Sequence, residues 1–208
     1  MDNDAHCAAL AESAAGAEKG TNSSVTITLG TGVGSGIIID GKVYSGFNFA
    51  GGEIGHTVIV VDGEPCGCGR KGCWESYASA TALIRQTKQA AKENPESAIN
   101  KLVDGDMNKV DAKTAFDAAK LGDKTGEMVV KQYIRYIAEG IINVINIFMP
   151  EVLVIGGGVC KEGDYLLNPL KEIVKEGVYS KEEIPQTEIK IAQMGNAAGI
   201  VGAAMLGA

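Results

Sequence analysis

The sequence predicts an α/β fold, and three patterns carry this prediction. A buried strand, residues 151–155, ends in three consecutive glycines and is followed by a helical segment. Residues 23–30 and 36–46 are rich in β-branched side chains and lie on either side of a glycine-rich turn. Residues 125–148 repeat apolar side chains every three or four positions, as an amphipathic helix does. Alternation of such elements along 208 residues is typical of an α/β protein with one large domain or two small ones.

The remaining elements follow from the same patterns. Residues 4–18 are rich in alanine and lack β-branched side chains, which predicts a helix that ends before Gly20. Further strands are predicted at 57–61 and 187–194, and further helices at 79–92, 111–120, 163–177 and 196–206. Only residues 93–110 show weak organisation.

The composition favours a small-molecule ligand and a reducing compartment. A formal net charge of −7 argues against a nucleic-acid groove or an anionic membrane surface as partner. Three of the five cysteines are clustered and two are isolated, which does not form an even disulfide set, so we expect a cytoplasmic location. No targeting segment is recognised, and polar residues interrupt the most hydrophobic stretch, 137–149. We therefore expect no membrane partner.

One imidazole and three thiols lie within eighteen residues, at His56, Cys66, Cys68 and Cys73. Zn²⁺ prefers four tetrahedral nitrogen and sulfur ligands, and the glycines between these cysteines allow a tight loop. The pattern predicts a closed, structural zinc site. The alternative is that the four residues are unrelated and that the cysteines act as small buried hydrophobes.

Two carboxylates accompany the predicted metal loop. Glu53 lies three residues before His56, and Glu75 lies two residues after Cys73. Closing the loop on zinc brings both acids toward one place, where they suit a ligand rich in hydroxyl groups. For Glu75 alone, a helix first-turn carboxylate that opposes the helix dipole is an equal interpretation.

Two glycine-rich turns are candidates for contact with a nucleotide. Residues 28–36 carry glycine at every second position between two strands, so that backbone N–H groups can approach phosphates, and the hydroxyl of Ser35 adds a donor. A flat adenine or ribose could lie against the glycines after strand 151–155. The alternatives are a flexible hairpin tip and a tight strand-to-helix turn. The candidate nucleotide-binding residues are Gly30, Thr31, Gly32, Gly34, Gly156, Gly157 and Gly158.

Several short motifs together resemble a known family. They are Gly55-His56, Cys66 to Glu75 with Ser79 beyond it, Thr28 to Gly36, Val154 to Val159, and Asn3-Asp4-Ala5. These motifs resemble the ROK family of bacterial sugar kinases and repressors, most closely its glucokinases, and the resemblance covers nearly the whole chain. His6 stands where that family has a second asparagine.

The resemblance implies an actin-like ATPase lobe of the ribonuclease H-like class with a zinc-bound loop. Residues 1–20 are then the catalytic-motif helix left from an N-terminal lobe, and residues 21–208 are the C-terminal lobe, with the zinc loop at 56–73. The family's first phosphate motif, Asp-x-Gly-Gly-Thr, is missing from this sequence. We therefore expect the chain by itself to be a poor catalyst and to associate as a homodimer or higher oligomer.

The resemblance also implies ATP-dependent phosphorylation of a hexose, with conversion of glucose to glucose 6-phosphate favoured and Mg²⁺ accompanying ATP. Asp4 is then the catalytic base, although the residues alone are equally consistent with a helix cap. His56 is expected to bind sugar with one ring nitrogen and zinc with the other. The implied sugar ligands are Asn3, Glu53, His56 and Glu75. The alternative is a sugar-sensing regulatory module of the repressor type without its DNA-binding element.

Overall fold

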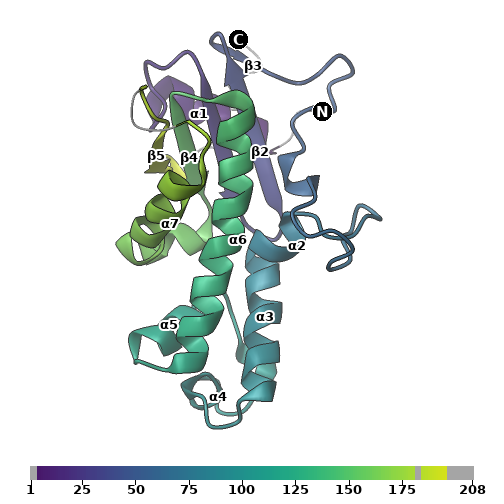
Figure 1. The fold of residues 1–208 in the computed structure, drawn as a ribbon, viewed down its shortest axis with the longest axis vertical. Helices are drawn as coiled ribbons and strands as arrows, with labels where there is room; N and C mark the ends of the chain where they lie inside the picture. The colour runs from purple at the N-terminus through teal and green to yellow at the C-terminus, as the bar shows by residue number, and fades with distance from the viewer. Residues whose placement is uncertain (1–3, 181–183, 196–208) are drawn as a thin grey trace.

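The computed structural model describes residues 4–180 and 184–195, which form a five-stranded sheet with helices on both faces (Figure 1). The strands are β1 Ser24–Leu29, β2 Val33–Ile39, β3 Lys42–Val43, β4 Val152–Gly156 and β5 Glu188–Ile191. The α-helices are α1 Asp4–Ala15, α2 Glu75–Ala78, α3 Ala80–Glu93, α4 Ala98–Leu102, α5 Thr114–Lys120, α6 Lys124–Phe148 and α7 Asp164–Gly177. Short 3₁₀ turns are η1 Ile54–His56, η2 Met107–Lys109 and η3 Gly158–Glu162.

The sheet has the strand order β3-β2-β1-β4-β5. β1 is antiparallel to β2 and parallel to β4, and β4 is parallel to β5. In the register, Thr28 of β1 lies opposite Gly34 on one side and Gly156 on the other. The chain therefore leaves β1 and β4 at the same edge of the sheet, where ligands of open α/β sheets bind.

The main core lies between the sheet and the helices α6 and α7, which lie in front of the sheet in Figure 1. Ile27 and Leu29 of β1 are fully buried on this side. Trp74 joins the same cluster; its indole N–H donates to the carbonyl of Tyr136 at 2.7 Å. A Cβ at Gly140 of α6 would lie 2.0 Å from the Trp74 ring, so this position in the helix has to remain glycine.

On the other face, α1 lies very close to β2. A Cβ at Gly36 would be 2.5 Å from Cβ of Ala9 and 2.6 Å from the carbonyl oxygen of Ala5. A Cβ at Gly34 would be 3.0 Å from Cβ of Ala5. These glycines are therefore required for packing, a reason that is independent of any ligand.

Most elements agree with the sequence predictions, and one does not. Residues 57–61 do not form a strand. Val58 makes an isolated bridge to Cys73, and Ile59 N–H donates to the carbonyl of Gly72 at 2.9 Å. The β-branched pattern was misleading because the glycine-rich loop folds back on this segment and leaves no straight partner for it. The weakly organised stretch contains α4 and η2, and the helix predicted at 196–206 lies outside the described residues.

A buried glutamate lies in the connection between α1 and β1. Glu18 is 0% exposed, and its carboxylate accepts hydrogen bonds from the hydroxyls of Ser24 at 2.9 Å and Thr26 at 2.5 Å. Burial raises the pKa of Glu18 from 4.5 to about 7, and the nearby Glu12 carboxylate adds to the rise. The folded protein therefore holds this proton more tightly than the unfolded chain does.

This pKa makes stability depend on pH. The contribution of Glu18 is fully present below about pH 4.5 and is lost as the pH rises through about 7, because the folded state then has to bury a charge. We expect Glu18→Gln to match the parent at pH 4 and to exceed its free energy of unfolding by up to about 3 kcal/mol at pH 8. Urea unfolding at both pH values measures this. Exposed Glu96→Gln is the control, and equal behaviour of both variants would contradict the prediction.

Candidate active site and metal centre

The four predicted zinc ligands lie together. His56 Nδ1 is 3.5 Å from Cys66 Sγ, and Cys68 Sγ is 3.6 Å from Cys73 Sγ. All four ligand atoms lie within 4.8 Å of one another. Zn–S bonds of about 2.3 Å and Zn–N bonds of about 2.0–2.1 Å place tetrahedral ligands about 3.5–3.8 Å apart. The donor set and its spacing therefore fit a zinc ion, with Nδ1 of His56 as the nitrogen ligand.

Two loop glycines allow this arrangement. Gly69 and Gly72 have φ of +88° and +77°, and a Cβ at Gly72 would be 1.7 Å from the carbonyl oxygen of Val60. Cys66 N–H donates to the carbonyl of Arg70 at 2.9 Å, which closes the tip of the loop. The left-handed backbone at these two glycines lets the loop turn its sulfurs to one side. Any residue with a side chain would be strained at either position.

The thiols differ in their environments. Burial, followed by contacts with the Cys68 and Cys66 sulfurs, raises the pKa of Cys73 to about 12. A backbone hydrogen bond at Arg70 is the largest influence on Cys68, which is exposed and has a lowered pKa. A cation that binds all three sulfurs therefore has to displace protons, most of all from Cys73.

The segment that carries Glu53 is held against the sheet by Ser35. The Ser35 hydroxyl donates to the carbonyl of Gly52 and accepts from Ile54 N–H at 3.3 Å. This side chain is 3% exposed, so the hydroxyl expected at a phosphate is used inside the protein. Glu53 itself is exposed, and its carbonyl accepts from His56 N–H at 3.1 Å. Glu53 and His56 are therefore presented by a single 3₁₀ turn.

Glu75 connects the metal loop to the turn between β1 and β2. Its Oε2 accepts from Val33 N–H at 3.0 Å, and its Oε1 is 3.7 Å from Cys66 Sγ. A Cβ at Gly32 would be 2.3 Å from Oε2, so the glycine makes room for the carboxylate. Glu75 is also the first residue of α2, as the alternative interpretation required. Glu75 therefore lies beside the metal loop and also in the first turn of α2, and its role as a sugar ligand stays a prediction.

The two glycine-rich turns meet at one edge of the sheet. Gly157 has φ of +108°, and a Cβ there would be 2.2 Å from the carbonyl oxygen of Leu29. At Gly30 and Gly158, by contrast, no atom of the described residues other than the chain neighbours lies within 4 Å of an added Cβ. The space beside the Cα atoms of these two glycines is open, although the N–H of Gly30 donates to Gly32 and its carbonyl accepts from Ala80 N–H. Gly34, in contrast, lies inside β2 and faces α1. The role of each glycine in binding a nucleotide stays a prediction.

The N-terminal motif lies at the start of α1. Asn3 lies outside the described residues, and Asp4 is the first residue of the helix. His6, 5% exposed, has its Nε2 3.7 Å from where a Cβ on Gly52 would be. The beginning of α1 is therefore close to the segment that leads into Glu53.

A family model described as the ROK family matches residues 1–208. The chain belongs to the ROK family. A glucokinase from Halalkalibacterium halodurans is 42% identical over 99% of this ROK chain and 62% of its own length. A solved ROK family glucokinase from Streptomyces griseus, in complex with glucose and AMPPNP, is 38% identical with a TM-score of 0.90, covering 99% of this chain and 67% of that one. A xylose repressor from Caldicellulosiruptor bescii is 29% identical over 97% of this chain and 50% of its own length.

These matches confirm the predicted α/β class, because the fold corresponds to that of solved ROK sugar kinases. The ROK chain spans less than two thirds of the length of the first curated relatives, at 66% and 62%. Within the described residues, no helix is both long and apolar enough to cross a membrane.

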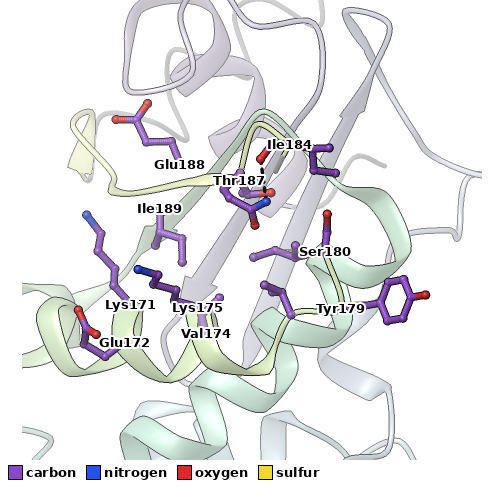
Figure 2. Close-up of a pocket in the computed structure, with 13 residues that line it drawn as sticks. Lys171, Glu172, Val174, Lys175, Tyr179, Ser180, Ile184, Thr187, Glu188 and Ile189 are labelled. Carbon is purple, nitrogen blue, oxygen red and sulfur yellow. Dashed lines mark hydrogen bonds between the residues drawn. The ribbon is translucent and has the colours of Figure 1, made fainter. Parts of the chain in front are cut away.

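A cavity of about 1140 Å³ in this ROK chain lies away from the site, between α7 and the segment that leads into β5 (Figure 2). Val174 and Lys175 of α7 line one side, and Thr187 and Ile189 line the other. None of the predicted site residues lines it. The site is therefore recognised by its chemistry and not by cavity size.

Two neighbouring glycines of the ROK chain, Gly157 and Gly158, allow a role in packing to be tested separately from a role in nucleotide binding. Gly157→Ala should destabilise the fold by about 1–3 kcal/mol or more, because alanine is strained at positive φ and its Cβ would collide with Leu29. Gly158→Ala has neither problem and should leave stability within about 0.5 kcal/mol of the parent. If the open backbone at Gly158 contacts nucleotide, this second variant should raise KM for ATP. Equal Tm values for the two variants would contradict the packing role of Gly157.

Proposed function

We propose that the protein containing this chain transfers the terminal phosphoryl group of ATP to a hexose, with glucose as the favoured substrate. The observation that carries the proposal is the position of Glu75. One carboxylate contacts both the backbone where the β1–β2 turn enters β2, at Val33, and the cysteine loop, whose Cys66 lies beside His56. A sugar held at the loop and phosphates held at the turn would therefore be neighbours. Support comes from the solved relative of 38% identity that binds glucose and AMPPNP.

The residues then have distinct roles. Asp4 takes the proton from the sugar's 6-hydroxyl while that oxygen forms a bond to the terminal phosphorus and the bond to the ADP oxygen breaks. Glu53 and Glu75, together with Asn3, accept hydrogen bonds from the other hydroxyls. Nε2 of His56 is on the side of the ring away from Cys66, so it can bind sugar while Nδ1 binds metal.

The metals have supporting roles in this proposal. Zinc, held by His56 and the three cysteines, would keep the loop closed and the imidazole in one tautomer. Mg²⁺ bound with ATP supplies positive charge to the phosphates. The chain's own contribution to transfer is mainly positioning, with the bare backbone at Gly30 and Gly158 beside the phosphates and adenosine. The Gly30 N–H donates to the carbonyl of Gly32 at 3.0 Å, so a backbone donor to a phosphate would come from another residue of the turn.

The test is an assay of the full-length protein with ATP and a panel of sugars. ADP release is measured with glucose, mannose, fructose, allose and N-acetylmannosamine, and we expect the highest kcat/KM with glucose. Xylose serves as the control because it has no 6-hydroxyl to accept the phosphoryl group. Sugar binding by calorimetry without turnover on any hexose would contradict the proposal and favour a sugar-sensing module instead.

A further inference from the structure

The contact of α1 with the glycines of β2 is made by small side chains. Ala5 and Ala9 rest directly on Gly34 and Gly36. Alanine and glycine allow a close approach, but they bury little apolar area and offer no ridge that opposes sliding. A polar contact elsewhere on α1 would therefore add to what fixes the helix along the sheet.

Glu12 supplies such a contact. Its side chain is 1% exposed and lies at the far end of α1 from Asp4. Oε2 accepts from Ala17 N–H at 2.7 Å, and Oε1 accepts from Met194 N–H at 2.8 Å. Gly16 makes room for it, since a Cβ there would be 2.1 Å from Oε2. A buried carboxylate is costly unless it is well bonded, and here each oxygen receives a backbone donor.

The two donors come from distant parts of the chain. Ala17 lies in the turn after α1, whereas Met194 follows β5 and is 182 residues from Glu12 in sequence. Glu12 therefore joins the end of α1 to the connection beyond the opposite edge of the sheet. Neither bond depends on a ligand.

We propose that Glu12 is a positioning residue for phosphoryl transfer: it fixes α1 along the sheet and so places Asp4 against the sugar. This inference rests on the proposed function. Helix geometry puts Glu12 about 12 Å from Asp4 along a rigid helix, so a shift at one end moves the other. A misplacement of about 1 Å in a reacting group can cost roughly 10²-fold in rate.

The test compares two glutamate-to-glutamine variants in the full-length protein. In Glu12→Gln the side-chain amide nitrogen faces a backbone N–H, so one bond is lost and two donors oppose each other. We expect kcat to fall about tenfold or more, KM for the hexose to stay within about threefold, and amide exchange in α1 to accelerate about tenfold. Glu18→Gln makes the same chemical change at a carboxylate bonded to β1 hydroxyls, and should leave kcat within about twofold.

A second variant acts on the other partner of the same bond. Met194→Pro removes the N–H that reaches Oε1 and leaves Glu12 in place, so it should reproduce the loss of kcat. The double variant should be no slower than the slower single one, because both remove one interaction. Met194→Pro also decides the matter if Glu12→Gln does not fold.

The outcomes distinguish this inference from the proposed function. Parental kcat together with parental α1 exchange in both Glu12→Gln and Met194→Pro would overturn the positioning role. A parent protein that phosphorylates no hexose would instead overturn the proposed function. Amide exchange in α1 would then decide by itself whether Glu12 holds the helix.

Discussion

Replacement of Asp4 by asparagine is expected to lower turnover by about 10²- to 10⁴-fold while leaving hexose affinity within about threefold. Asparagine keeps the size and hydrogen-bonding shape of aspartate, but it cannot take a proton from the attacking hydroxyl. Steady-state kinetics with saturating ATP, together with sugar binding by calorimetry, separate the two effects.

The matched control for this variant is Asp40→Asn. Asp40 is exposed in the turn between β2 and β3 and has φ of +52°, a conformation that asparagine also tolerates. We expect parental turnover from this control. If Asp4→Asn retains more than half of the parental rate, Asp4 serves only to cap the helix, and the catalytic role is wrong.

Loss of the metal ligand Cys73 is expected to remove zinc and to destabilise the protein strongly. The parent should contain one Zn²⁺ per chain by elemental analysis, and Cys73→Ser should contain much less. Structural zinc contributes about 10–16 kcal/mol in zinc-finger peptides, and we expect a loss of at least about 4 kcal/mol here. For a protein of this size, that corresponds to a fall in Tm of roughly 8–16 °C.

Cys160→Ser is the control for this experiment. Cys160 is also a buried thiol, but it lies in η3 and its Sγ donates to the carbonyl of Ile155, away from the metal loop. It should keep the full zinc content even if serine costs some stability. A parent without zinc, or a Cys73→Ser variant with parental metal content and Tm, would contradict the assignment.

The sequence shows the order of the helices and strands because that order depends on short-range patterns. The period of residues 125–148 corresponds to α6, and Asp123 begins this helix by accepting from Gly126 N–H. The alanine-rich segment corresponds to α1, although the helix ends at Ala15 and not at residue 18. The one wrong strand, at 57–61, failed because its pairing depends on the fold of a loop that starts later in the chain.

A signal for Glu12 was present in the sequence. Ala5, Ala9 and Glu12 are spaced i, i+4 and i+7, so they lie on one face of the helix. Side chains as small as alanine on that face indicate a close contact with a neighbouring element. A glutamate on that face has to be buried, and therefore has to find donors. The identity of the donors could not be predicted, because Met194 is 182 residues away.

By itself, the sequence determined most of the elements and the candidate ligand types: the chain order of α/β structure, four nitrogen and sulfur donors at zinc spacing, and two glycine-rich turns after strands. These features depend on residue type and spacing within a few turns of the chain. Only the tertiary structure decided that Thr28 lies opposite both Gly34 and Gly156, which brings the two turns to one edge. It also decided that Ser35 bonds within the protein and that Glu75 joins the turn to the metal loop. Register and donor pairing between distant segments depend on how the whole sheet and its helices pack, and no local pattern encodes that.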